Sequence, residues 1–302
     1  MSPARNQRLI WLDGSLVKPE DAKISILSPT TMYGLNVFET IRGYRTADNM
    51  TALFRARDHV ERLMQSCRIL DVSYSGSVDV VLDAIQETLE ACCFEDDVSM
   101  RVVLFFDDEG GWSSTSEARL MIAPIAKGRA YTDPISCCIS SWERIKDNSA
   151  PPRAKVGANY VSGRLSQLEA KRNGFDMPLL LNSRGTISEA PGACFFIVRD
   201  GVLVTPPGHA SILESITRLS IFEIADDLNI GVQVREIDRT EVYCANEAFV
   251  CGTAVEITPV RAIDHCEISV GDQAPVTSAI SSRYFDIARA KVDEKKDLLI
   301  IC

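Results

Sequence analysis

Short apolar segments, separated by turn-forming residues, recur along the whole chain and limit the folds open to it. Segments whose length and apolar character predict strands lie at residues 37–42, 101–106, 120–123, 135–140, 177–181, 193–198, 202–204, 232–234, 248–251 and 258–263. Helical periodicity is found at about 58–70, 78–92, 160–172, 215–228 and 274–291. Because these helices do not alternate one by one with the strands, the order predicts an α+β protein and not an alternating βαβ chain.

Two local signals mark the start of a hairpin and the start of a helix. The dipeptide Asp13-Gly14 stands between two apolar stretches, and it accepts the positive φ values of a type I′ hairpin turn. Asp58 is expected to cap the first long helix, with Glu61 three residues later as its capping-box partner.

The domain boundary is predicted in a stretch without periodicity. Residues 124–134 contain glycine and proline but follow neither a helical nor a strand pattern. We therefore expect a small N-terminal α/β domain over 1–128 and a larger C-terminal domain over 129–302. A chain of 302 residues with 46% hydrophobic residues can bury two cores.

Composition excludes several classes of function. A formal net charge of −10 disfavours nucleic acid as a partner, because phosphate binding needs a basic surface. No apolar run reaches the roughly 18 residues of a membrane helix, and the first residues lack the apolar region of a signal peptide. The ten cysteines contain no C-x-x-C pair and the three histidines are well separated, so no metal site is expected. This many free thiols indicates a reducing, cytoplasmic location.

One lysine stands at a junction between a loop and a helix. A proline-containing break at residues 150–153 precedes Lys155, small residues follow it, and Tyr160 opens the helical pattern of residues 160–172. A solvated loop lysine is one explanation of this setting. A lysine that bonds covalently to a flat cofactor is the other.

Two further stretches could bind charged groups, one of them a cationic group and the other an anion. Glu189 lies between a predicted strand and a Pro-Gly turn, where it is either a solvated turn residue or a fixed anion beneath a cofactor's ring nitrogen. Ser215 and Thr217 stand at a predicted helix N-terminus, where backbone N–H groups and the helix dipole favour an anion. Simple capping of the helix is the alternative for these two residues.

A glycine turn and an arginine complete the set of candidates. Gly252 and Thr253 follow a buried strand, and glycine lets a ligand approach the backbone while the hydroxyl can reach a phosphate oxygen. An ordinary turn explains them equally well. Arg62 flanks the apolar face of its helix, where a solvated helix arginine is the simple explanation.

Motifs of other enzyme classes are missing from the sequence. It contains no G-x-x-x-x-G-K-[ST] phosphate loop and no G-x-G-x-x-G after a strand. It also contains no G-x-S-x-G elbow, so nucleotide-dependent and serine-hydrolase functions have little support.

Taken together, the chain resembles the class IV, fold-type IV pyridoxal-phosphate aminotransferases, and among them the branched-chain amino-acid aminotransferases most. The resemblance runs from about Trp11 to Ile287. The segments that carry it, in the family's order, are Tyr33-Gly34 with Val37-Phe38-Glu39-Thr40-Ile41-Arg42, Phe54-Arg55 with His59-Val60-Glu61-Arg62-Leu63, Lys155 with Asn159-Tyr160, Ile187-Ser188-Glu189, Ile216-Thr217-Arg218, and Gly252-Thr253-Ala254-Val255-Glu256-Ile257-Thr258-Pro259-Val260. The resemblance implies two domains, the larger of them with a β-barrel-like core.

The resemblance also implies roles for the residues around pyridoxal 5′-phosphate. Lys155 would form the Schiff base and move the proton as general base and acid. Tyr160 would bind the cofactor's 3′-oxygen, and Glu189 would pair with its ring nitrogen and keep the ring an electron sink. The phosphate would be held by Arg62, the amides of Ile216 and Thr217, the Thr217 hydroxyl and Thr253, with Leu213 packed on a ring face.

The substrate would bind beside the cofactor, under the first domain. By resemblance, Tyr33, Phe38, Arg42 and Arg101 line the side-chain pocket, and the Thr253-Ala254 backbone helps to bind the substrate carboxylate. The chain differs from the family's pattern at Ser99, where a tyrosine is usual two residues before the arginine. It also differs at Glu214-Ser215, in place of Pro-Gly, and at Ala190-Pro191-Gly192, in place of Gly-Ala-Gly.

The expected function is therefore a transaminase. It would exchange an amino group between an L-amino acid, branched-chain or otherwise apolar, and a 2-oxo acid, with glutamate and 2-oxoglutarate as the common pair. Its alternatives within the fold are a D-amino-acid transaminase, an (R)-amine transaminase or an aminodeoxychorismate-lyase-type enzyme. A non-catalytic cofactor store is disfavoured, because binding alone does not require both Lys155 and Glu189. The family is usually dimeric, so a homodimer or higher homo-oligomer is expected.

Overall fold

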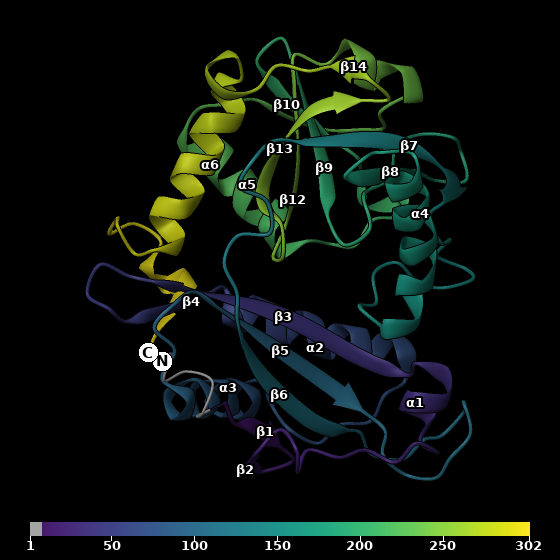
Figure 1. The fold of residues 1–302 in the computed structure, drawn as a ribbon, viewed down its shortest axis with the longest axis vertical. Coiled ribbons are helices and arrows are strands. Elements are labelled where there is room, and N and C mark those ends of the chain that lie inside the picture. The colour runs from purple at the N-terminus through teal and green to yellow at the C-terminus, as the bar shows by residue number, and fades with distance from the viewer. Residues whose placement is uncertain (1–7) are drawn as a thin grey trace. The chain divides into compact units, whose positions relative to one another are not determined.

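The computed structural model describes residues 8–302, which divide into two compact units (Figure 1). Unit 1 contains the chain up to Gly128, the short segment Ala154–Ala158 and the C-terminal segment Asp286–Cys302. Unit 2 contains Arg129–Arg153 and Asn159–Phe285. Each unit thus gathers separate stretches of sequence, and the division into domains 1–128 and 129–302 stays a prediction.

Unit 1 is built on one antiparallel sheet with strands of very different length. Its strands, in the order in which they pair, are β15 (Leu299–Ile301), β4 (Thr51–Phe54), β3 (Asn36–Arg45), β5 (Val98–Phe105), β6 (Arg119–Ala126), β1 (Ile10–Leu12) and β2 (Ser15–Val17). The predicted hairpin at Asp13-Gly14 is confirmed, because β1 and β2 pair with Leu12 opposite Ser15 and both turn residues have positive φ. The sheet also recruits its edge strand β15 from the C-terminal segment.

Helices α2 (Ala56–Leu70) and α3 (Val78–Cys92) pack on the sheet of unit 1 (Figure 1). They bury an apolar cluster that includes Ile41, Leu63 and Ile85. The extent predicted for α3 is confirmed, with Ser77 as its cap, and a short helix α1 (Pro29–Tyr33) precedes β3.

The cap predicted for α2 is wrong. The helix begins at Ala56 after Arg55, whose φ of 53° ends the preceding turn and which gives no side-chain cap. Asp58 lies inside the first turn, and its carboxylate pairs with the guanidinium of Arg55 and not with the backbone N–H groups that a cap would satisfy.

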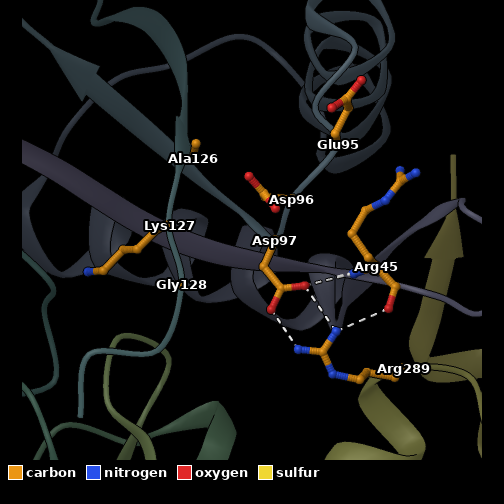
Figure 2. Close-up of a pocket in the computed structure, with 8 residues that line it drawn as sticks. All are labelled: Arg45, Glu95, Asp96, Asp97, Ala126, Lys127, Gly128 and Arg289. Carbon is orange, nitrogen blue, oxygen red and sulfur yellow. Dashed lines mark hydrogen bonds and ion pairs between the residues drawn. The ribbon is translucent and has the colours of Figure 1, made fainter. Parts of the chain in front are cut away.

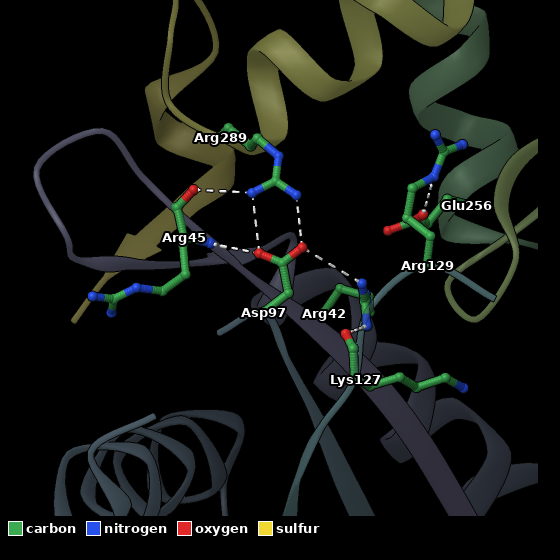
Figure 3. Close-up of polar contacts among 7 residues, drawn as sticks. All are labelled: Arg42, Arg45, Asp97, Lys127, Arg129, Glu256 and Arg289. Carbon is green, nitrogen blue, oxygen red and sulfur yellow. Dashed lines mark hydrogen bonds and ion pairs between the residues drawn. The ribbon is translucent and has the colours of Figure 1, made fainter. Parts of the chain in front are cut away.

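An aspartate joins three segments of unit 1. Asp97 accepts hydrogen bonds from Arg289 through Nη1 at 3.0 Å and Nη2 at 2.6 Å, and from the backbone N–H of Arg45 at 2.9 Å (Figure 2). Arg42 reaches the same carboxylate at 3.9 Å and donates to the Lys127 carbonyl at 2.6 Å (Figure 3). These bonds tie the C-terminal segment to β3 and to the end of β6.

Unit 2 contains a second sheet with both parallel and antiparallel pairs. Its strands pair in the order β11 (Val232–Val234), β10 (Val202–Thr205), β9 (Cys194–Arg199), β12 (Glu247–Gly252), β13 (Glu256–Ile263), β7 (Ile135–Glu143) and β8 (Met177–Leu181), and β14 (Cys266–Glu267) pairs with β13. The mixture of helix and sheet confirms the predicted α+β class, and this sheet forms the expected barrel-like core as a half-barrel.

Side chains of β9 and β12 alternate between two faces of this sheet. Phe195 and Val250 lie in the apolar cluster on one face. Phe196 and Phe249 stack on the other face at 4.9 Å between ring centroids, and Phe222 contacts Phe196 there. Phe222 belongs to helix α5 (Ile216–Asp227), so this packing fixes α5 against β12.

Two more α-helices lie wholly or mostly in unit 2. Helix α4 (Tyr160–Arg172) has the predicted bounds and packs on β7 and β8 (Figure 1). Helix α6 (Pro275–Ala288) begins where the carboxylate of buried Glu247 accepts hydrogen bonds from the N–H groups of Val276 and Thr277. Arg129 pairs with Glu256 at 3.2 Å (Figure 3). Within residues 8–302, no helix combines the length and the hydropathy of a membrane span.

Candidate functional site

Lys155 is fixed at both of its backbone polar groups within unit 1. Its N–H donates to the hydroxyl of Ser66 on α2 at 3.1 Å, and its carbonyl accepts from the N–H of Phe38 on β3 at 3.0 Å. An isolated bridge between Val37 and Val156 extends this pairing. The segment around Lys155 therefore lies along the start of β3, and the lysine's position does not depend on a loose loop.

The side chain of Lys155 lies over an aromatic ring that a second cation shares. The Nζ atom is 4.9 Å from the ring centroid of Phe38, and the Cζ atom of Arg101 is also 4.9 Å from that centroid. Such cation–π contacts hold the two charged groups near an apolar surface. The structure therefore brings together Lys155, Phe38 and Arg101, three residues predicted from the sequence.

Arg62 lies in a buried cluster of charged side chains. Its Nε and Nη2 atoms donate to Glu39 at 2.7 Å and 2.9 Å, and Nδ1 of His59 is 2.8 Å from the same carboxylate. Burial raises the pKa of Glu39, but Arg62 and His59 outweigh it and hold that pKa well below its usual range. Burial also lowers the pKa of His59.

The remaining predicted residues of unit 1 have different environments. Tyr33 is half exposed at the end of α1. Arg42 is buried, with its guanidinium 5.2 Å from the ring centroid of Tyr44 and directed to Lys127 and Asp97. A cavity of about 630 Å³ opens beside these contacts (Figure 2), and no residue of the predicted site lines it.

Glu189 is the best-defined site residue of unit 2. It is only 2% exposed, and Arg144 contacts its Oε1 through both Nε and Nη2 at 2.8 Å. The N–H of Leu213 lies 3.2 Å from each carboxylate oxygen, and the thiol of Cys194 is 3.9 Å from Oε2. An arginine and a backbone donor together fix the position of this carboxylate.

The N-terminus of α5 follows Leu213 directly. The Ser215 hydroxyl accepts the N–H of Arg218 at 3.2 Å, which confirms that Ser215 caps the helix. Thr217 is buried in the first turn, beside Ile216. The amides of a first turn have no acceptors within the helix, and the dipole makes this end positive, so it suits an anion.

Close backbone contacts connect the other predicted residues of unit 2. The Tyr160 ring lies beside Gly192, whose φ is 78°, and a Cβ atom at Gly252 would be only 3.0 Å from the Gly192 carbonyl oxygen. Thr253 and Ala254 form the turn between β12 and β13. Gly252 is thus required by packing, and it leaves the Thr253 turn accessible at the end of the strand.

The structure adds three residues to which the sequence analysis assigned no role. Arg144 fixes Glu189, Ser66 fixes the backbone of Lys155, and Glu39 fixes Arg62. No local signal in the sequence marked these three residues, and even Arg144 follows the exposed end of strand β7. Among residues 8–302, no group of histidine, cysteine and acidic side chains is placed to hold a metal ion.

The chain matches the model of the class IV amino-transferases over residues 36–263. It is 35% identical to a branched-chain-amino-acid aminotransferase of Escherichia coli strain K12 over 298 residues, which cover 95% of this chain and 94% of that one. It is 34% identical to a probable branched-chain-amino-acid aminotransferase of Aquifex aeolicus over 296 residues, covering 96% and 95% of the two chains.

Solved structures give the same result in three dimensions. A branched-chain aminotransferase of Thermoproteus uzoniensis, crystallised with norvaline, superposes with a TM-score of 0.93 and 36% identity, covering 97% of this chain and 98% of that one. A branched-chain amino acid aminotransferase of Thermobaculum terrenum, in its PLP-bound holo-form, has a TM-score of 0.92 and 32% identity, with 97% of each chain covered.

Proposed function

Because the chain belongs to the class IV aminotransferases, we propose that it is a pyridoxal-phosphate-dependent transaminase of branched-chain and other apolar L-amino acids. The acceptor is a 2-oxo acid, with 2-oxoglutarate and glutamate as the common pair. The observation that carries the proposal is the buried Glu189, held by Arg144 and by the Leu213 N–H group. A buried carboxylate fixed in this way is suited to pair with a protonated ring nitrogen. A solvated turn glutamate would not need such partners.

The residues present fit pyridoxal phosphate by their chemistry. Lys155 offers a primary amine on a fixed backbone, and Glu189 offers an anion for the ring nitrogen. The capped N-terminus of α5 offers amides for a phosphate, to which Arg62 adds a positive charge. Gly252 supplies the close backbone approach that precedes the Thr253 turn.

Pyridoxal phosphate, when bound, supplies an electrophilic carbon for the amino group and a ring that takes up electrons. The protein then has to move one proton and hold the charges. Lys155 removes the proton from Cα of the amino acid as a general base and returns a proton as an acid. Glu189 holds a proton on the ring nitrogen, and Tyr160 donates to the cofactor's 3′-oxygen.

The other predicted residues divide the binding work. In this proposal Arg62, Ile216, Thr217 and Thr253 would bind the phosphate, and Leu213 would pack on the ring. Thr253 also binds the substrate carboxylate, with Ala254.

The substrate side chain lies among residues of unit 1. Tyr33, Phe38, Arg42 and Arg101 line its pocket, and Phe38 gives that pocket an apolar surface beside Lys155. An apolar surface at this point favours leucine-like side chains, because their burial releases water from apolar groups.

A donor panel tests the proposal. The enzyme is loaded with pyridoxal phosphate and given 2-oxoglutarate with L-leucine, L-alanine, D-alanine or an (R)-configured primary amine, and glutamate is quantified. We expect L-leucine to be the best donor, with one 4-methyl-2-oxopentanoate formed for each glutamate. Preference for D-alanine or for the amine would replace this proposal by the corresponding transaminase. Failure of all four donors would reject the transaminase function.

We also propose that the enzyme is a cytoplasmic homodimer. The exposed face of α4 presents Val161, Leu165 and Leu168 to the surface, with Trp142 exposed on β7, and apolar groups of this kind are typical of an interface. Ten free cysteines suit a reducing compartment. Light scattering during size-exclusion chromatography should give the mass of two chains, and Leu165→Glu should reduce it toward one.

A further inference from the structure

A buried carboxylate lies next to the arginine that we assign to the phosphate. Glu39 is on β3, where its neighbour Phe38 contacts Lys155, and its side chain is 0% exposed. It accepts two hydrogen bonds from Arg62, one on each oxygen, and a third contact comes from His59. Each carboxylate oxygen thus has at least one nitrogen of α2 within 3 Å.

Stability alone gives little reason for this arrangement. Removing a carboxylate and a guanidinium from water carries a large desolvation cost, and a buried ion pair of this kind contributes little net stability compared with apolar residues of similar volume. What two parallel hydrogen bonds do provide is direction, because the guanidinium is planar and its Nε and Nη2 atoms are both engaged. The plane of the Arg62 side chain is therefore set by Glu39.

The same face of α2 also holds the backbone of Lys155. Ser66 follows Arg62 by one helical turn, and its hydroxyl accepts the N–H of Lys155. Arg62 and Lys155 thus take their positions from neighbouring points on one helix. An error in the orientation of Arg62 would change the distance between the phosphate ligand and the reactive amine.

We propose that Glu39 is a positioning residue for recognition of the cofactor phosphate, acting through Arg62. The inference rests on the proposed function, since it takes the cofactor to be a phosphorylated pyridoxal derivative. Glu39 touches neither cofactor nor substrate in this proposal. It holds the guanidinium in the orientation in which a phosphate oxygen meets its N–H donors, so that the cofactor does not have to order the side chain when it binds.

The test compares two ligands that differ only in the phosphate. Pyridoxamine 5′-phosphate and pyridoxamine lack the aldehyde, so neither bonds covalently to Lys155. The dissociation constant of pyridoxamine divided by that of pyridoxamine 5′-phosphate, called the ligand ratio, measures the phosphate's contribution. Calorimetric titration of Glu39→Gln should show the affinity for pyridoxamine 5′-phosphate falling about tenfold or more, as for loss of a hydrogen bond to a charged group, with the affinity for pyridoxamine unchanged. An equal loss for both ligands, or no loss, would overturn the proposal.

A second arm separates positioning from a direct or general effect. In the Arg62→Met background, Glu39→Gln should no longer change the ratio, because its effect passes through the arginine. A further fall of the ratio in that background would show that Glu39 does not act through Arg62. Arg62→Met alone tests the proposed function: if it leaves the ratio unchanged, Arg62 is not a phosphate ligand, whatever Glu39 does.

Two more variants keep the test decisive if Glu39→Gln does not fold. Glu39→Asp keeps the buried negative charge but shortens its reach by one methylene, so it should lower the ratio while retaining the native circular dichroism spectrum; a wild-type ratio would contradict the proposal. Asp97→Asn is the matched control in the same unit, since Asp97 also accepts two hydrogen bonds from one arginine, Arg289. It should lower stability and leave the ligand ratio as in the wild type, and a changed ratio would count against a specific role of Glu39.

Discussion

Arg144 contacts a single oxygen of Glu189, Oε1, through both Nε and Nη2 at 2.8 Å. The N–H of Leu213 lies 3.2 Å from both oxygens, and the thiol of Cys194 is 3.9 Å from the other oxygen, Oε2. The carboxylate is therefore held asymmetrically, with its stronger partner on one side. Removing Arg144 would take away the ion pair of this buried carboxylate.

Arg144→Gln should reduce turnover about 10- to 100-fold, because a hydrogen bond to a charged group contributes about 1.5–3 kcal/mol. Affinity for pyridoxamine 5′-phosphate should change less than turnover, since the variant disturbs the ring-nitrogen carboxylate and not the phosphate ligands. Steady-state kinetics with L-leucine and a binding titration give the two values. Arg144→Lys, which keeps the charge, should recover part of the turnover, and wild-type kinetics for Arg144→Gln would show that this ion pair is not needed.

Lys155→Ala should abolish covalent attachment of the cofactor while the fold persists. Treatment of the wild-type enzyme with pyridoxal phosphate and borohydride should add one phosphopyridoxyl group to the peptide containing Lys155, as read by mass spectrometry. The variant should gain none at this peptide, and its circular dichroism should be unchanged. Lys171→Ala, at the exposed end of α4, is the control and should be labelled normally. Labelling of the variant at another lysine, with full activity, would contradict the assignment.

Ser66→Ala should reduce turnover more than it reduces stability. The variant removes the acceptor of the Lys155 N–H group, at a cost to stability of about 1 kcal/mol. Thr88→Val is the matched control, because Thr88 is a buried helix hydroxyl of the same unit whose hydrogen bond stays within α3. Urea denaturation should give similar losses for both variants, while only Ser66→Ala lowers kcat. Equal kcat values in the two variants would remove Ser66 from the positioning of Lys155.

Gly252→Ala should destabilise unit 2 by about 1–3 kcal/mol, as overpacking of a filled site does. The new Cβ atom would lie 3.0 Å from the carbonyl oxygen of Gly192, and a backbone group cannot move aside as a flexible side chain can. The shift should carry over to Thr253 and weaken pyridoxamine 5′-phosphate binding. Gly231→Ala serves as control, since its Cβ atom would meet Val202 at an ordinary 3.7 Å. Identical stability of the two variants would disprove the steric argument.

The stability of the fold should fall as pH is lowered from 7.5 toward 5, and His59 should carry part of this dependence. Burial lowers its pKa, and the neighbouring Arg62 and Lys155 also lower it while Glu39 raises it. A folded-state pKa below the unfolded value means that the unfolded chain binds the proton more readily, so the free energy of unfolding decreases below about pH 6.5. One such group contributes a slope of at most about 1.4 kcal/mol per pH unit.

Urea denaturation at several pH values should therefore show a flatter profile for His59→Gln than for the wild type. His209→Gln, at an exposed histidine, is the control and should keep the wild-type slope. If both variants keep that slope, His59 is not the group responsible.

The features predicted well from the sequence are those with a local cause. The helices Val78–Cys92 and Tyr160–Arg172 have the predicted bounds, because their periodicity lies within the segments themselves. Strands β4, β14 and β15, each of two to four residues, were not predicted. The cap at Asp58 failed because a nearby arginine competed for the carboxylate.

For the site, too, local features could be predicted from the sequence and long-range contacts could not. The types of residue that hold a cofactor could be named from motifs, and their roles stay proposals. The contacts that fix them join residues 89, 45 and 23 positions apart, in the pairs Ser66–Lys155, Arg144–Glu189 and Glu39–Arg62. Spacing along the chain carries no information on such pairs, because they arise only when distant strands and helices pack.

The segment Ala154–Ala158 and strand β15 have a practical consequence for dissecting the protein. Both belong to unit 1, although they come after Gly128 in the sequence. No single cut of the chain therefore yields that unit intact. A fragment ending at Gly128 would lose the carbonyl that accepts the Phe38 N–H and would expose β4 as an unpaired edge, which invites pairing with other chains. To produce unit 1 alone as a soluble monomer, the gene therefore has to encode residues up to Gly128 joined by linkers to Ala154–Ala158 and to the C-terminal segment with β15.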